Sequence, residues 1–103
     1  MSSKNGYLAV ALYYPEVGRE KDFIKLWQEG PCKLAEEMGA KKISIYFRPE
    51  TNDYLATGHW ENVDIFLKFC NSPKLAPWIE KINDICRKPC THESFRIIEE
   101  RAA

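Results

Sequence analysis

A histidine and a tryptophan are adjacent in the middle of the chain, as His59 and Trp60. Histidine can take a proton near neutral pH, and a phenolic substrate must lose a proton before it is oxidised as its anion. His59 is therefore the candidate catalytic residue. The alternative is a hydrogen-bonded histidine in a subunit interface, and the sequence leaves open which face of the protein it occupies.

Aromatic side chains recur at helical spacing in the two regions of the chain with helical periodicity. They suit a flat apolar ligand, because ligand pockets are mostly apolar with a few polar groups. The alternative is core packing, which is the usual role of aromatic residues at helical spacing, and both can hold together. Tyrosines on predicted strands could orient a ligand or contact a partner subunit, as could Tyr14. Arg48 could bind a carboxylate through two hydrogen bonds. The predicted pocket residues are Trp27, Phe66, Phe69, Trp78, Tyr13, Tyr46 and Arg48.

The last third of the chain contains a Cys-x3-Cys-x-His pattern, formed by Cys86, Cys90 and His92. Zinc sites favour a shorter spacing between cysteines and usually add a fourth protein ligand. The sequence therefore predicts no metal site, with a zinc site or a redox pair as alternatives. Cys32 and Cys70 lie among apolar helical residues and are expected to act as small hydrophobic side chains.

Length and charge restrict the class of protein. The 103 residues indicate one domain spanning residues 1–103, with a core of about 7–99, and this length can bury a real core. Lys and Arg together number 15, as do Asp and Glu, so there is no basic surface for nucleic acid. No apolar run approaches the length of a membrane span, and the first residues lack the apolar core of a signal peptide. We expect a cytoplasmic protein with free thiols and with neither nucleic acid nor membrane as partner.

Periodicity predicts the elements that would position these residues. Residues 7–14 form an apolar run typical of a strand buried on both faces, whereas 41–48 and 54–60 alternate and predict a hairpin. Residues 19–38 have helical spacing, broken by Gly30-Pro31, where we expect a kink or two shorter helices. A second helical region begins at Asn62, which can cap it, and continues after Ser72-Pro73 to about residue 87. Residues 91–99 predict a last strand.

The order β-α-β-β-α-β is that of the ferredoxin-like fold, an α+β plan with a four-stranded antiparallel sheet. Both helical regions cover one face of the sheet, and the first and third strands are central. The other face would then expose apolar side chains, which is unusual for a monomer. We therefore predict a homodimer.

The pattern resembles the antibiotic biosynthesis monooxygenase (ABM) family over roughly residues 7–99. The resemblance is carried by a strand ending in Trp60-Glu61, by Phe66, and by Asn71-Ser72 eleven residues after the Trp-Glu pair. It implies a dimeric α/β barrel with a pocket between each sheet and its helices. It also implies oxidation of small aromatic or quinol substrates by dioxygen without a metal or organic cofactor.

Other members of the family degrade haem, and this chain departs from their pattern. Their pocket Trp aligns with Phe69, their haem-ligating His near Ile79, and their catalytic Asn near Ala11. Many further members carry His near positions 69 and 74, where this chain has Phe and Lys. The hypothesis is therefore a cofactor-independent monooxygenase-like enzyme. Its alternative is a non-catalytic homodimer that binds a small apolar ligand or acts as a scaffold, and haem degradation is disfavoured.

Overall fold

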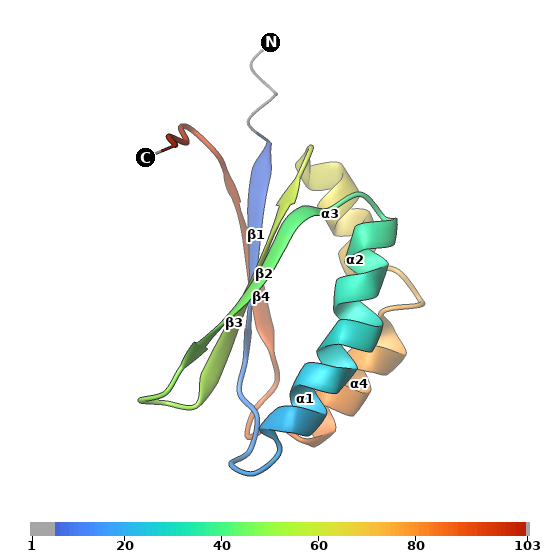
Figure 1. Ribbon diagram of the computed structural model, residues 1–103. Helices are drawn as coiled ribbons and strands as arrows, with labels where there is room; N and C mark the ends of the chain where they lie inside the picture. Colours follow the sequence, from blue (N-terminus) through green and yellow to red (C-terminus); the bar gives the residue numbers. More distant parts are fainter. Residues whose placement is uncertain (1–5, 103) are drawn as a thin grey trace.

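The computed structural model describes residues 6–102 and contains one antiparallel sheet with helices on one of its faces (Figure 1). The elements in chain order are β1 (Tyr7–Tyr13), α1 (Glu20–Trp27), a π-helical turn (Gln28–Cys32), α2 (Lys33–Glu37), β2 (Lys41–Arg48), β3 (Asp53–Trp60), α3 (Val63–Cys70), α4 (Ala76–Asp84) and β4 (Thr91–Arg96). The strand order is β2-β3-β1-β4. The predicted ferredoxin-like fold is confirmed, with the first and third strands at the centre.

The strands agree closely with the alternation in the sequence, and the helical regions differ in detail. Gly30-Pro31 interrupts the first helical region as expected, but the interruption is a π-helical turn that joins α1 to α2. Proline has no backbone N–H for the regular helical ladder, and a π turn is a common way to absorb such a defect. The last helix and the last strand are shorter than predicted, since α4 covers Ala76–Asp84 and β4 ends at Arg96.

The start of α3 shows how local sequence fixes an element that the pocket needs. Asn62 has an extended backbone, and its side-chain Oδ1 accepts a hydrogen bond from the Ile65 backbone N–H at 3.0 Å. This is the predicted N-cap, which satisfies a donor that has no partner within the helix. The cap sets where the helix begins, so Phe66 and Phe69 face the sheet one turn later.

The core lies between the sheet and the helices. Phe23 and Ile82 are fully buried at its lower end, next to the rings of Tyr13 and Tyr54. The opposite face of the sheet carries no helix or strand of residues 6–102 (Figure 1). Within the same range, no helix has the length and apolarity needed to cross a membrane.

Candidate active site

Small residues on the two central strands create a hollow under the helices. Ala11 of β1 lies opposite Ala56 of β3, and Ala9 lies opposite Gly58. Paired residues in antiparallel strands share a face, and side chains alternate along each strand, so all four face the helices. These side chains are too short to reach the helical layer. A cavity of about 300 Å³ remains above them, which is at the lower end of the range for small-molecule sites.

Aromatic rings form the walls of this cavity. Trp60 lies with its ring centroid 5.7 Å from Phe66 and 5.2 Å from Phe69, and the two phenylalanine rings are 6.4 Å apart with planes inclined by 30°. Trp27, at the end of α1, also lines the cavity. The π-helical turn adds Pro31 and Cys32 to the wall. The cavity is therefore apolar and suited to a flat ring.

Four of the predicted pocket residues line the cavity: Trp27, Phe66, Phe69 and Tyr13. The other three lie elsewhere, for reasons of strand alternation and packing. Trp78 packs against Gly30 of the π-helical turn, and Lys81 Nζ lies 4.8 Å from its ring centroid. Tyr46 is opposite Leu55 on the uncovered face of the sheet. Arg48 binds Asp53 at the end of the hairpin.

His59, the predicted catalytic residue, lies on the face of the sheet opposite the cavity. It pairs with Leu8 of β1, one position out of phase with Ala9 and Gly58. Its Nδ1 is 3.6 Å from the Glu100 carboxylate. Strand alternation separates it from the cavity although its neighbour Trp60 is part of the wall. A ligand in the cavity is therefore out of its reach.

The other histidine of the chain, His92, lines the cavity and was missed as a pocket residue from sequence. It lies opposite Ala11, in the pairing of β4 with β1, and its ring meets the Phe66 ring edge-on at 5.9 Å and 80°. The sequence pattern had placed it in the Cys-x3-Cys-x-His motif. Among the described residues, no three His, Cys, Asp or Glu side chains converge to hold a metal ion. The sequence could have identified His92 as a pocket residue from its position in the alternation of the last strand. That inference required knowing that this strand pairs with β1.

Polar groups in the cavity are few and mostly neutral. Tyr13 is 4% exposed, and its side chain is part of the cavity lining. Burial, reinforced by nearby thiols, raises its pKa far above the ordinary value. The three cysteines of the lining, Cys32, Cys70 and Cys90, are free thiols whose pKa values are raised, chiefly by burial. These groups are protonated near neutral pH.

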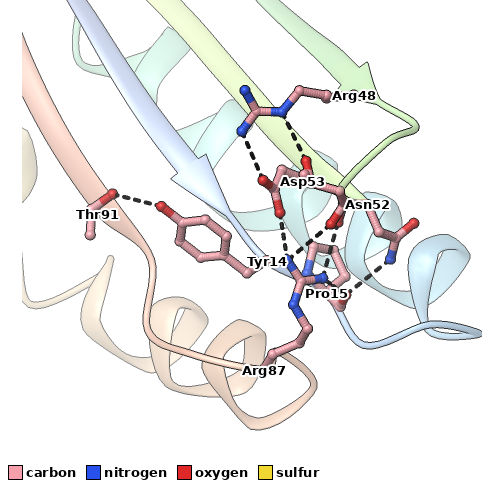
Figure 2. A network of polar contacts seen from close by, with 8 residues as sticks. Tyr14, Pro15, Arg48, Asn52, Asp53, Arg87 and Thr91 are labelled. Atoms are coloured by element: carbon pink, nitrogen blue, oxygen red, sulfur yellow. Dashed lines mark hydrogen bonds and ion pairs between the residues drawn. The ribbon is translucent and has the colours of Figure 1, made fainter.

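A charged network fixes the strand ends below the cavity (Figure 2). Asp53 accepts hydrogen bonds from Arg48 at 2.9 Å and from Arg87 at 2.5 Å. Burial opposes ionisation of this carboxyl, but hydrogen bonds from Arg48, Thr51 and Arg87 and the charge of Arg87 outweigh it and lower its pKa to about 2. Arg87 also donates to the Pro15 carbonyl at 2.9 Å. The network thus ties the hairpin and the end of β1 to the segment that leads into β4.

The start of β4 is held by one further contact in the same region. The Tyr14 hydroxyl lies 3.4 Å from Thr91 Oγ1, next to His92 in sequence (Figure 2). The Arg87 network and this contact both act on the segment between α4 and β4. Together they set the position at which His92 enters the cavity wall.

The fold and the helix–sheet cavity together define an α+β protein of ferredoxin-like type, and comparison with solved structures narrows this class. No protein-family model matches the chain, and no curated protein is significantly similar to it in sequence. Its fold is that of the ABM proteins. A crystal structure of an antibiotic biosynthesis monooxygenase superposes with a TM-score of 0.75 at 12% identity, over 90% of this chain and 99% of the other.

Two further structures have the same fold. SnoaB of Streptomyces nogalater, a cofactor-independent oxygenase, gives a TM-score of 0.77 at 16% identity, covering 93% of this chain and 96% of its own. Rv0793 of Mycobacterium tuberculosis gives a TM-score of 0.77 at 10% identity, covering 93% of this chain and 98% of its own. Similarity at these identities concerns the fold, so the chemistry must be argued from the cavity.

Proposed function

We propose that this protein binds a flat, uncharged aromatic molecule between its helices and its sheet and oxidises it with dioxygen without a metal or organic cofactor. The observation that carries this function is the apolar cavity of about 300 Å³ with aromatic walls. Its lining, within residues 6–102, contains no Asp, Glu, Lys or Arg. A charged ligand would lose its hydration there without compensation, so a neutral ring is favoured.

Trp27, Phe66 and Phe69 would hold the ring, and the Tyr13 hydroxyl would orient one of its oxygen atoms by donating a hydrogen bond. A hydroquinone is the simplest substrate for such a reaction. Its ring gains one oxygen atom, the second oxygen of dioxygen leaves as water, and the ring supplies four electrons and ends as a hydroxyquinone. No external reductant is then required. SnoaB, described as a cofactor-independent oxygenase, supports this class of reaction through its shared fold.

We also propose that a second copy of the chain covers the uncovered sheet face. Leu8, Val10 and Leu12 of β1 and Leu55 of β3 lie on this face and remain partly exposed in the single chain. Phe95 and Tyr46 on the edge strands are 50% and 56% exposed. A contiguous apolar face of this kind is typical of an interface.

The four free thiols fit the reducing cytoplasm expected from the sequence.

The test is to combine the purified chain with 1,4-naphthohydroquinone and to measure both binding and oxygen uptake. Binding is followed by quenching of tryptophan fluorescence, because Trp27 and Trp60 line the cavity. Uptake above the rate of spontaneous oxidation, with one dioxygen consumed per hydroquinone, supports the enzyme. Binding without uptake supports the non-catalytic ligand-binding protein instead. Absence of binding across a panel of one- to three-ring hydroquinones overturns both.

A further inference from the structure

His92 occupies the rim of the cavity, between its apolar interior and solvent. It is an exposed residue of the edge strand β4, and yet it is part of the lining. Its ring lies edge-on to Phe66, a wall residue, at 5.9 Å. A side chain in this position can touch a bound ring and exchange protons with water.

The titratable groups that face His92 from the surrounding elements do not compete with it for a proton. They are Tyr13 of β1, Cys32 of the π-helical turn, Cys70 of α3 and Cys90 just before β4. Burial raises the pKa of each, so all four are already protonated at neutral pH. From α4 the lining receives Ile79 and Asn83, which do not titrate, and the described lining holds no charged side chain. An imidazole is the one group in this set that ordinarily accepts a proton near neutral pH.

The Tyr13 hydroxyl provides a second polar group at the buried end of the same cavity. The Tyr13 side chain is 4% exposed and is part of the cavity lining. Continuing the pairing of β1 with β4 by one residue sets Tyr13 diagonally across from His92, on the same face. An oxygen-bearing ring could therefore contact a donor at its inner end and a base at its outer end.

We propose that His92 is the catalytic base and that the ligand is a neutral hydroxyarene that binds as a phenol and is ionised in place. The phenolic O–H bond breaks, its electron pair stays on oxygen, and the proton forms an N–H bond with the neutral imidazole. The product is a phenolate beside an imidazolium, which is a charge-assisted pair. A phenolate ring is richer in electrons than the phenol, so it transfers an electron to dioxygen more readily. This role deepens the proposed oxidation, but the ionisation itself needs no oxygen.

The experiment uses 4-nitro-1-naphthol as probe, because its anion absorbs visible light. The wild-type chain, His92→Gln and His59→Gln are each saturated with probe, and the pH at which half of the bound probe is ionised is measured. His59→Gln is the matched control, since it changes the other histidine of the chain on the opposite sheet face. We expect His92→Gln to raise this pH by about one unit or more, and His59→Gln to leave it unchanged.

A purely structural role for His92 gives a different result. If His92 only packs against Phe66, the Gln variant changes probe affinity equally at every pH and leaves the ionisation midpoint where it was. That result overturns the proposal, as does a failure of the probe to bind the wild type. Addition of free imidazole to His92→Ala provides a second readout, because the rim position leaves access from solvent. Recovery of the ionised probe is expected, and no recovery counts against a proton-accepting role.

Oxygen uptake separates this proposal from the proposed function. If ionisation of the probe depends on His92 but no oxygen is consumed, His92 is supported as the base and the proposed monooxygenase activity is rejected. If oxygen is consumed and His92→Gln leaves kcat and the pH profile unchanged, the activity is supported and His92 is rejected as the base. We expect kcat to fall at least about tenfold in this variant and the acidic limb of its pH profile to disappear.

Discussion

Gly30 of the π-helical turn and Trp78 of α4 are in direct contact, with the indole lying against the backbone of the turn. A β-carbon at Gly30 would lie 2.3 Å from Trp78 Cδ2 and 2.4 Å from Cγ. Glycine is thus required for the indole to approach so closely. The contact explains why Trp78, an expected pocket residue, packs outside the cavity. The same turn contributes Pro31 and Cys32 to the cavity wall.

Replacement of Gly30 by Ala should destabilise the protein. Alanine normally favours a helix over glycine, but here its methyl group would overlap three atoms of the Trp78 ring on α4. Overpacking of this kind costs about 1–3 kcal/mol. Urea unfolding measures the change in the free energy of unfolding.

Gly58→Ala is the matched control, since a β-carbon there would meet no atom closer than 3.6 Å. Its free energy of unfolding should be unchanged or higher by up to about 1 kcal/mol. Equal destabilisation of the two alanine variants would contradict the close contact between Gly30 and Trp78.

Asp53→Asn should remove an acid-sensitive contribution to stability. The folded-state pKa of Asp53 is about 2, below its ordinary value of 3.8, so the unfolded chain binds the proton more readily. The stabilisation is therefore present above the ordinary value and is lost as pH falls from there to about 2. At pH 7 the Asn variant should lose about 1–3 kcal/mol, the usual cost of removing hydrogen bonds to a charged group. Its stability should also depend less on pH across this interval.

Asp22→Asn is the control for the Asp53 variant. Asp22 also accepts a hydrogen bond from an arginine at 2.9 Å, but its side chain is 62% exposed, against 8% for Asp53. Exposed pairs contribute about 1 kcal/mol or less. Thermal unfolding between pH 2 and pH 7 measures how the stability of each variant depends on pH. Equal acid sensitivity of both variants would refute a special role for the Asp53 network.

The architecture was accessible from the sequence because its signals are local. Ile43, Ile45 and Phe47 alternate with polar residues and define β2, and Asn62 marks the start of α3. A buried strand followed by a hairpin and two helical regions then leaves few possible topologies. The aromatic pocket residues Trp27, Phe66 and Phe69 follow from helical spacing once the helices are known to cover the sheet.

The residues that were misplaced depend on relations that one sequence does not contain. His59 and Trp60 are neighbours in the chain but face opposite sides of the sheet, and the phase of the hairpin relative to the helices decides which side meets the cavity. His92 becomes a pocket residue only through the register of β4 against β1. Trp78 packs outside the cavity because it contacts Gly30, which lies 48 positions earlier in the chain.

Gly58→Val should reduce ligand binding without harming the fold. The Gly58 position faces the cavity from a central strand and has space for a β-carbon, so the two methyl groups would occupy ligand volume. Valine also suits a strand better than glycine. The dissociation constant for a hydroquinone or for the naphthol probe should rise about tenfold or more, as measured by fluorescence quenching.

Ser44→Val on β2 provides the comparison for Gly58→Val. Ser44 pairs with Thr57 on the opposite face of the same sheet, so the substitution adds a branched side chain away from the cavity. Its ligand affinity should match that of the wild type. Equal losses of affinity in both variants would show that the ligand does not bind in the cavity.

Phe95→Asp should separate the proposed dimer into monomers. Phe95 is opposite Leu8 on the uncovered face and is 50% exposed in the single chain, so a polar residue there costs the monomer little. In a two-fold dimer both copies would bury an unpaired carboxylate, which should raise the dissociation constant at least about a hundredfold. Val17→Asp is the control, because it adds the same charge at an apolar residue that is 84% exposed, on the loop before α1. Light scattering at micromolar concentration should give a dimer for the wild type and for Val17→Asp, and a monomer for Phe95→Asp. A monomeric wild type, or a Phe95→Asp variant that remains a dimer, would show that a second copy does not cover this face.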